Sequence, residues 1–385
     1  MPLTMLWRES GSVLLADRHM TGHPWRMQRP WRQRCATAAL LTLALIIGAG
    51  CRPASGALAG ALDRPGQIVR LADGRGLNFQ CSGRGAPTVL LEAGFGADSR
   101  AWAKVQPTVS RTTRVCSYDR AGYGFSDPGP LPRDGAAIAR DLDQALAQAD
   151  IRGPFIVVGH SAGGLYARLF AARRQADIAG LVFLDPTIEQ IAPADIPDAD
   201  GLGGIRQRLG RCLAMSLEPL TPDTRDPIAS DCKLRASAIA PATAADLWRN
   251  QLSELDNIFR RTSSETARIG GMLADVPVYV ITASDTAAAA PRVGLERPQS
   301  TWELRHQQLA RQFQTSSQQT VLSSHLVMVD RPDVAIAAIF EMVRATQERR
   351  TPAPLPPSEW SPRPLVGDVD DGFQSPRPAA EPFTK

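Results

Sequence analysis

The sequence predicts an α/β fold, in which a mostly parallel sheet of eight strands carries helices on both faces and a helical cap insertion. Three observations lead to this prediction. The composition is that of a globular protein, with 43% hydrophobic and 21% charged residues in a chain of 385. Short apolar runs alternate with helical patterns along the middle of the chain. A long interval without a strand then follows Leu184, where a subdomain is expected.

Eight short apolar runs are expected to form the strands. In chain order they cover residues 67–71, 77–81, 88–92, 114–118, 155–158, 180–184, 278–282 and 319–322. Helical patterns are found at residues 136–149, 165–173, 302–313 and 334–344. Because helical patterns lie between the later strands, most of the sheet is expected to be parallel.

The folded domain is expected to span residues 60–350, with the cap at about 188–272. Roughly 90 residues separate the last two expected strands from the six before them, and a crossover usually needs far fewer. Within this interval Leu252, Leu255 and Phe259 keep helical spacing, while prolines interrupt the first half. The insertion is therefore expected to be mainly helical.

Both ends of the chain look different from the middle. Residues 1–59 are expected to form a leader and linker, because a basic stretch precedes an apolar run at 36–49 that is short for a membrane span. Cys51 follows Gly-Ala-Gly and resembles the lipidation site of bacterial lipoproteins, with simple cleavage after residue 59 as the alternative. The chain is thus expected to be exported, either to the bacterial cell envelope, with a possible membrane tether through its N-terminus, or into the medium. The proline-rich tail 351–385 is expected to be disordered.

The charge distribution argues against a nucleic-acid partner. The formal net charge is +4, and six arginines against two acidic residues in residues 1–51 account for all of it. The remainder of the chain is neutral, whereas binding to nucleic acid needs a basic face that displaces phosphate counterions.

A pentapeptide with the pattern G-x-S-x-G carries the first chemical signal. Gly159-His-Ser161-Ala-Gly163 comes directly after the fifth expected strand and before an alanine-rich helix. In this strand-turn-helix context the motif is typical of a nucleophile elbow, a turn so tight that both flanking positions must lack bulk. Ser161 is therefore the candidate nucleophile, at a helix N-terminus that favours developing negative charge.

A serine hydroxyl needs a base, and the chain has five histidines. His19 and His23 lie in the leader, and the side chain of His160 is expected to point away from the site. His306 falls in an expected helix, where a packed or surface position is expected. His325 lies in a loop that enters the last helix, and it is the candidate base. So few histidines exclude a multi-histidine metal site, and no C-x-x-C occurs, so neither a metal nor a cofactor is expected.

The oxyanion hole is expected from the loop after the third strand, with the sequence Glu92-Ala-Gly-Phe-Gly96. The peptide N–H groups of Phe95 and Ala162 can both face the developing oxyanion, and each such donor is worth about 3 kcal/mol of barrier. The two glycines are not a dinucleotide-binding fingerprint, because the third glycine is absent.

With these motifs the chain resembles the α/β-hydrolase superfamily, in particular esterase-like members related to proline iminopeptidases and bacterial serine hydrolases. The segment 115–127, with Asp119 and Gly122-Tyr-Gly124, is similar to the fourth-strand region of the family, and 325–332 is similar to its histidine loop. The order of serine, acid and histidine along the chain is also the family's order. The resemblance implies that Asp119 shapes the floor of the site in a structural role.

Two aspartates qualify as the third member of the triad, which holds the imidazole in its useful tautomer. Asp285 follows the seventh expected strand, the position commonest in the superfamily. Asp185 ends the sixth strand and precedes Pro186, a position that a minority of relatives use. We favour Asp185, with Asp285 as the alternative.

The cysteines fit an exported chain, because four remain after Cys51. The sheet order of the resembled fold makes the strands of Cys81 and Cys116 neighbours, and Cys212 and Cys232 both lie in the expected cap. The resemblance therefore implies two disulfides, one in each pair.

The function expected from the resemblance is that of a serine hydrolase, which cleaves a small or medium carboxylic ester through an acyl-enzyme intermediate. The alternative is an aminopeptidase or amidase, in which cap carboxylates such as Glu254 and Asp256 grip a substrate amine, although solvated charges are the simpler reading of both. A catalytically silent binding protein on the same scaffold is a third alternative. Epoxide hydrolases and haloalkane dehalogenases of this fold carry aspartate where Ser161 stands. The expected partner is a small-molecule acyl substrate, and its identity and the oligomeric state stay open.

Overall fold

A computed structural model describes residues 62–190, 199–217, 232, 244–287, 301–349 and 352–353 of the chain. The expected leader 1–59 and all but two residues of the expected tail 351–385 lie outside the described residues. The predictions of a signal segment, of lipidation at Cys51 and of a disordered tail therefore stay predictions.

Eight strands form one sheet in the order β1-β2-β4-β3-β5-β6-β7-β8. The antiparallel pairs are β1 with β2 and β2 with β4, and all later pairs are parallel. The strands are β1 (Gln67–Arg70), β2 (Gly76–Ser82), β3 (Thr88–Glu92), β4 (Val115–Tyr118), β5 (Phe155–His160), β6 (Ile178–Leu184), β7 (Val278–Ala283) and β8 (Ser316–Val321). The predicted fold class is confirmed.

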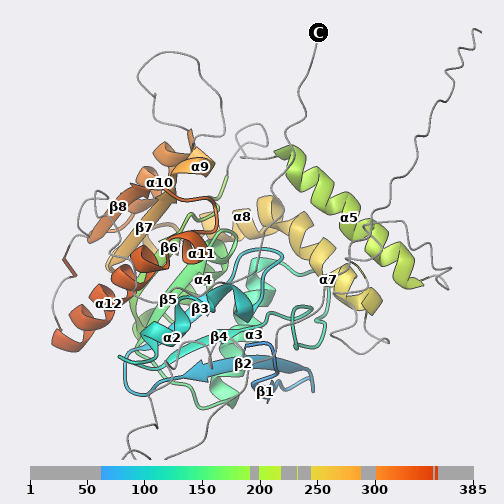
Figure 1. Cartoon of the computed structure of the whole chain (residues 1–385), viewed down its shortest axis with the longest axis horizontal. Helices are drawn as coiled ribbons and strands as arrows, with labels where there is room; N and C mark the ends of the chain where they lie inside the picture. Colours follow the sequence, from blue (N-terminus) through green and yellow to red (C-terminus); the bar gives the residue numbers. More distant parts are fainter. Residues whose placement is uncertain are drawn as a thin grey trace, which may run out of the picture. The chain divides into compact units, whose positions relative to one another are not determined.

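Successive residues of the central strands enter two separate apolar layers, as the two-residue period of a strand requires. Phe155 and Val157 of β5 belong to the layer under the helices α3 (Gly135–Gln148), α4 (Gly163–Arg173) and α10 (Thr301–Ala310). Ile156 and Val158 belong to the layer under α2 (Gln106–Val109) and α12 (Pro332–Glu348). The sheet is therefore covered on both faces, which explains why its strands read as continuous apolar runs. Figure 1 shows α12 in red running along the sheet.

The helices that cover the sheet connect successive strands, except for the last two, which follow β8. They are η1 (Ser99–Trp102), α2 (Gln106–Val109), α3 (Gly135–Gln148), α4 (Gly163–Arg173), η2 (Gln175–Asp177), α9 (Ser284–Ala287), α10 (Thr301–Ala310), α11 (Val327–Asp330) and α12 (Pro332–Glu348). The helix α3 begins at the Asp134 cap, whose carboxylate accepts the N–H of Ala137 at 2.9 Å.

The described part of the insertion between β6 and β7 is helical, as predicted. It contains α5 (Ala199–Leu217), α7 (Ala244–Asn257), η5 (Ile258–Thr262), α8 (Ser263–Ala267) and η6 (Gly270–Leu273). Figure 1 shows α5 and α7 side by side, and the two helices contact each other. A third apolar cluster joins Trp248 and Leu255 of α7 to Ala162 and Tyr166, so the cap packs on the segment that follows the elbow serine.

Both expected disulfides are present. Cys81 and Cys116 bridge the antiparallel strands β2 and β4, where the two residues face each other in register. Cys212 in α5 is bonded to Cys232, and both are buried in the cap cluster. The implied pairings are thus confirmed.

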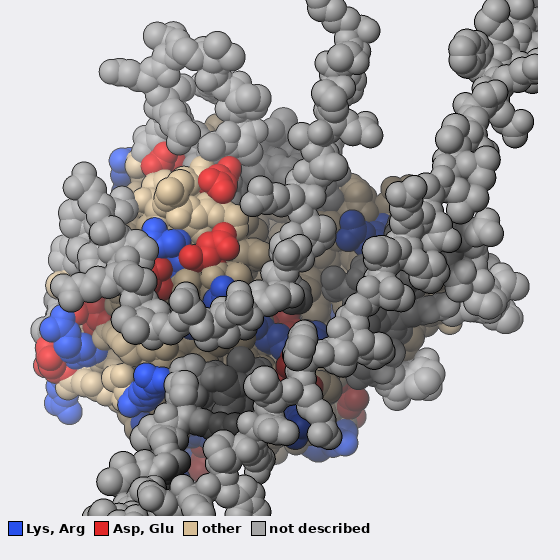
Figure 2. All heavy atoms as spheres, in the orientation of Figure 1, with Lys and Arg blue, Asp and Glu red and all other residues tan. Residues whose placement is uncertain are grey.

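The described surface carries charges of both signs. On the face drawn in Figure 2, the blue and red side chains that are visible are interspersed rather than gathered by sign. Among the residues that the structure describes, no helix combines the length and the hydrophobicity of a membrane span.

Candidate active site

Ser161 lies at the sharp turn between β5 and α4, and its backbone is left-handed with φ of 52°. The flanking glycines are needed for this turn. A Cβ at Gly159 would lie 2.7 Å from the carbonyl oxygen of Gly163, and a Cβ at Gly163 would lie 2.4 Å from that of Glu92. A strained conformation of a residue other than glycine is typical of a functional position, and the surrounding packing maintains it.

His325 and Asp185 form a hydrogen-bonded pair beside this turn. The imidazole Nδ1 lies 2.6 Å from Oδ2 of Asp185, which is buried at the end of β6. The other carboxylate oxygen, Oδ1, accepts the backbone N–H of Ala283 at 2.9 Å and the indole N–H of Trp302 at 3.1 Å. The His325 side chain is 41% exposed, so part of the ring is open to solvent.

The alternative acid is not in this pair. Asp285 is exposed in the short helix α9, and its carboxylate accepts the hydroxyl of Ser284 at 3.3 Å. Of the two aspartates left open by the sequence, the structure thus brings Asp185 to His325. Strand β6 ends directly against the turn between β5 and α4, where the Ser161 N–H donates to the carbonyl oxygen of Leu184 at 3.1 Å. Asp185 is the next residue after Leu184, so it lies close to this turn.

The carboxylate of Asp185 is held in its charged form. Burial disfavours that charge, but the hydrogen bond with His325 and the N–H of Ala283 outweigh the burial, and the pKa of Asp185 lies below its ordinary value. An ionised acceptor at Nδ1 keeps the ring proton on that nitrogen, which leaves Nε2 of a neutral His325 free to act as a base.

Two further side chains lie beside Asp185, and the sequence analysis did not name them as its neighbours; of the two, Trp302 donates a hydrogen bond to it. Besides Trp302, the buried His306 of α10 lies with Nδ1 4.0 Å from Oδ1 of Asp185. Its Nε2 donates to the Pro186 carbonyl oxygen at 2.8 Å, so Nδ1 accepts the hydroxyl of Thr282 at 2.8 Å. Burial lowers the pKa of His306 and favours this neutral form. Of the two positions expected for His306, packed or at the surface, the structure shows the packed one.

The expectation that His160 points away from the site is wrong. Its ring lies 4.7 Å from the ring of His325, measured between centroids, and its Nε2 donates to the carbonyl oxygen of His325 at 2.9 Å. Burial lowers the pKa of His160 to about 3, so the ring is neutral. His160 thus ties the loop of the candidate base to the residue before Ser161.

The loop after β3 packs directly against the elbow. A Cβ at Gly94 would lie 2.8 Å from Nδ1 of His160 and 3.0 Å from Cβ of Ser161, so only glycine allows this approach. Phe95 follows this glycine, and Ala162 is the buried cap residue of α4. The two residues expected to supply oxyanion donors therefore lie on the loop and the helix that meet at Ser161.

Asp119 is a buried structural acceptor, as the resemblance implies. Its two oxygens accept the backbone N–H groups of Ser99 and Phe125 and the amide of Asn78, at 2.8 to 2.9 Å. It thereby joins the segments after β3 and β4.

The cap carboxylates named for an amine-binding role are already paired. Glu254 of α7 is buried and hydrogen-bonds Arg120 at 3.0 Å, and Asp256 forms an ion pair with Arg206. The reading of Glu254 as a solvated charge is wrong, because its side chain is 2% exposed.

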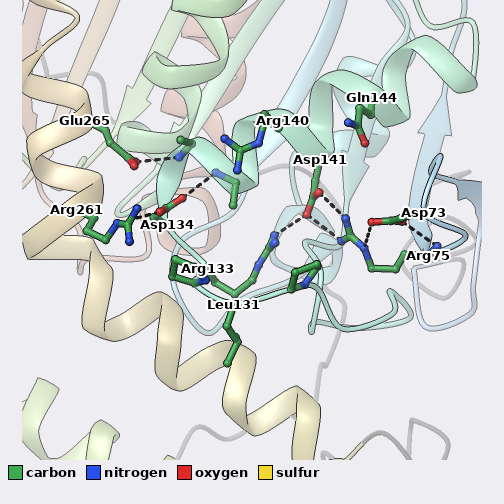
Figure 3. A pocket seen from close by; sticks show the side chains of 14 residues that line it. Asp73, Arg75, Leu131, Arg133, Asp134, Arg140, Asp141, Gln144, Arg261 and Glu265 are labelled. Carbon is green, nitrogen blue, oxygen red and sulfur yellow. Dashed lines mark hydrogen bonds and ion pairs between the residues drawn. The ribbon is translucent and has the colours of Figure 1, made fainter.

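A pocket of about 380 Å³ lies apart from this site, at the start of α3. Figure 3 shows three of its arginines turned toward acids, with Arg75 and Arg133 on Asp141 and Arg261 on Asp134. Neither the elbow nor the histidine pair lines it. The pocket is therefore lined by ion pairs, and the pair of Arg261 with Asp134 joins the start of α3 to the cap.

The buried histidines predict an acid-sensitive fold. The folded-state pKa of His160 is about 3, well below its ordinary value, so between about pH 6.5 and 3 the unfolded chain binds a proton that the folded chain does not. The free energy of unfolding therefore decreases as the pH is lowered through this window, by roughly 1 kcal/mol per pH unit for this group. Urea unfolding at about pH 7 and pH 5 measures it.

The control is the variant His160→Gln, which keeps a donor but does not titrate. The free energy of unfolding of this variant is expected to change less with pH than that of the wild type, by roughly 1 kcal/mol per pH unit. The comparison between the two chains is needed because burial raises the pKa of Glu92 to about 7 in both of them. The raised pKa of this carboxyl group makes the free energy of unfolding decrease as the pH rises, which is opposite to the effect of His160. Equal pH slopes for the two chains would contradict the assignment of His160 as a neutral group.

The comparison with known families gives the class of the protein. The sequence model of the alpha/beta hydrolase family matches residues 89–339, from β3 into α12, and the chain belongs to that family. The family match includes Ser161, Asp185 and His325.

Individual relatives extend this comparison. An uncharacterized protein of Schizosaccharomyces pombe is 32% identical over 190 residues, which are 40% of this chain and 36% of that protein. An uncharacterized Bacillus subtilis protein is 32% identical over 110 residues, 29% of this chain and 44% of that protein. The chain thus matches less than half the length of either. Among solved structures, an esterase of Exiguobacterium antarcticum has a TM-score of 0.51 at 12% identity, covering 72% of this chain and 99% of that one, which supports the fold alone.

Proposed function

We propose that this hydrolase cleaves a small or medium carboxylic ester through a covalent acyl-enzyme, with Ser161 as nucleophile, His325 as base and Asp185 as its orienting acid. The observation that carries the proposal is the 2.6 Å contact between Nδ1 of His325 and the buried Asp185, beside a serine on a left-handed turn. Such a pair supplies what a serine hydroxyl lacks at neutral pH, a base of fixed orientation.

In this mechanism the Ser161 oxygen attacks the acyl carbon while Nε2 of His325 takes the hydroxyl proton. The N–H groups of Phe95 and Ala162 stabilise the negative charge on the carbonyl oxygen of the tetrahedral intermediate. The C–O bond to the alcohol then breaks, and His325 returns the proton to the leaving oxygen. Water attacks the acyl-enzyme with His325 as base again, and the carboxylic acid and free Ser161 result.

An ester is favoured over the amide of an amino acid. An aminopeptidase of the kind considered needs a free acidic group in the cap for the substrate amine, whereas Glu254 is bonded to Arg120 and Asp256 to Arg206. A silent binding protein has no need for an imidazole oriented by a buried carboxylate or for a strained serine. Both observations support the esterase.

A panel of substrates tests the proposal. p-Nitrophenyl esters of graded acyl length are expected to be hydrolysed, with kcat/KM at least about 100-fold above that for p-nitroanilides of single amino acids. The optimum acyl length then reports the size of the pocket. Faster cleavage of the anilides would favour the amidase, and no cleavage of either set by folded protein would favour the silent scaffold.

We also propose that the protein is exported. Two disulfides support this, because such bonds persist mainly in oxidising compartments. A small-molecule acyl compound remains the proposed partner, and a tether through Cys51 remains the proposed alternative to simple secretion.

A further inference from the structure

Arg120 lies wholly buried between the sheet and the cap, and every one of its N–H groups has an acceptor. Nη1 donates to Oε1 of Glu92 at 2.8 Å and to the carbonyl oxygen of Ala93 at 2.6 Å. Nη2 donates to the carbonyl oxygen of Gly94 at 2.8 Å and to Oε1 of Glu254 at 3.0 Å, while Nε lies 3.5 Å from Oε2 of Glu254. One side chain thus joins β3, the loop after it and the cap helix α7.

Stability alone is a weak reason for this arrangement. Arg120, Glu92 and Glu254 are each 2% exposed, and burying charges costs as much as their attraction returns in many proteins. The cluster is nevertheless complete, since the hydroxyls of Tyr118 and Tyr166 donate to Glu92 and Glu254. A site that is so fully satisfied fixes the positions of its members.

The peptide between Gly94 and Phe95 gives the cluster a chemical consequence. This peptide is trans, so its carbonyl oxygen and its N–H point in opposite directions. The guanidinium of Arg120 holds the Gly94 oxygen on the buried side, and the N–H of Phe95 is therefore turned away from Arg120. A charged donor on the oxygen also polarises the peptide and makes its N–H a stronger donor.

We infer that Arg120 is a positioning residue of the oxyanion hole, and that Glu254 makes the orientation of this hole depend on docking of the cap. The inference rests on the proposed function and names what regulates that site. Gly94 lies against Ser161, so a rotation of this peptide moves the donor relative to the reacting carbonyl. Catalysis is sensitive to such small displacements.

The cap helix α7 is well placed to transmit its position. Three side chains of one helix stretch contact the main domain: Asn250 accepts the N–H of Gly129 at 2.7 Å, Gln251 donates to the carbonyl oxygen of Gly122 at 3.3 Å, and Glu254 binds Arg120. Helix α7 therefore sits in a fixed register on the segment that carries Arg120.

The test uses the full chain with Glu254→Gln, which keeps the size of the side chain and removes its charge. We expect kcat for the best p-nitrophenyl ester to fall about 10- to 100-fold with KM within about three-fold, because an oxyanion donor that is misplaced loses part of its 100- to 1,000-fold value. Binding of an alkyl boronic acid, which forms a tetrahedral adduct on a serine, is expected to weaken by the same factor. Arg120→Lys, with a charge but fewer donors, is expected to show the same pattern.

The matched control is Glu265→Gln, which alters another cap carboxylate bonded to the main domain, through the N–H of Ala136 at 2.9 Å. It is expected to keep kcat within about two-fold. Unchanged kcat and boronate affinity in folded Glu254→Gln and Arg120→Lys, with an active wild type, would overturn the inference alone. Equal losses in Glu265→Gln would also overturn it, since they would indicate an effect that does not pass through Arg120. A wild type that neither cleaves the esters nor binds the boronic acid would overturn the proposed function itself.

Discussion

Replacing Ser161 by alanine is expected to lower kcat for the best ester by about 10⁶-fold. The reason is that no other group can form the acyl-enzyme, so only binding and oxyanion stabilisation remain. The variant keeps a Cβ at the left-handed position, and its fold is expected to be unchanged. The loss is measured from the initial rate of p-nitrophenol release and from the presence or absence of an initial burst.

The matched control for this variant is Ser110→Ala. Ser110 follows α2, and its hydroxyl donates to the carbonyl oxygen of Pro107 at 2.9 Å. Activity in this control is expected to stay within about two-fold of the wild type. Retention of more than about 1% of kcat by Ser161→Ala would contradict the assignment of the nucleophile.

Replacing Asp185 by asparagine is expected to lower kcat by about 10⁴-fold. The carboxylate accepts the Nδ1 proton of His325, whereas the amide group of asparagine donates toward Nδ1 and favours the tautomer that carries its proton on Nε2. That nitrogen is then unable to take the proton of Ser161. Steady-state kinetics on the same ester, together with a thermal unfolding curve, separate this effect from a loss of folded protein.

Asp285→Asn is the control for this prediction, because the sequence left both acids open. Asp285 is exposed in α9 and its carboxylate contacts Ser284, so its replacement is expected to change kcat by less than about three-fold. A large loss in Asp285→Asn with near-normal activity in Asp185→Asn would reverse the assignment.

The strands that have their own apolar pattern could be predicted from the sequence. β3 covers Thr88–Glu92 as expected, whereas β5 extends beyond residue 158 to His160, because Gly159 and His160 continue the ladder with β6. β8 begins at Ser316 instead of 319, because its first residues are polar and give no apolar strand pattern. It is the last strand of the sheet and pairs only with β7, so most of its side chains need not be apolar.

The site was predictable where the chemistry lies in a local motif. Ser161 and the glycine loop follow from their turns, and His325 follows from the scarcity of histidines. The partners of Asp185 did not follow, because Trp302 and His306 reach it from a helix more than a hundred residues along the chain. The spacing of residues along the sequence does not indicate such a contact.

The same reason explains why the role of Glu254 was misread. On its helix it is one acidic residue among several, and only the packing of the cap brings it to Arg120 across 134 residues of sequence. Likewise His160 reads as a neighbour of the serine, while its bond to the backbone of His325 depends on a loop 165 residues away. Contacts between the cap, the sheet and the histidine loop are thus tertiary information.

Labelling with a fluorophosphonate tests the central claim most directly, because this reagent loses fluoride only to an activated serine hydroxyl. We expect folded wild-type protein to gain the mass of one phosphonyl group, and peptide mapping to place it on Ser161. Asp185→Asn is expected to label far more slowly and Ser161→Ala not at all. An adduct on another residue, or folded wild-type protein that stays unlabelled, would contradict the account.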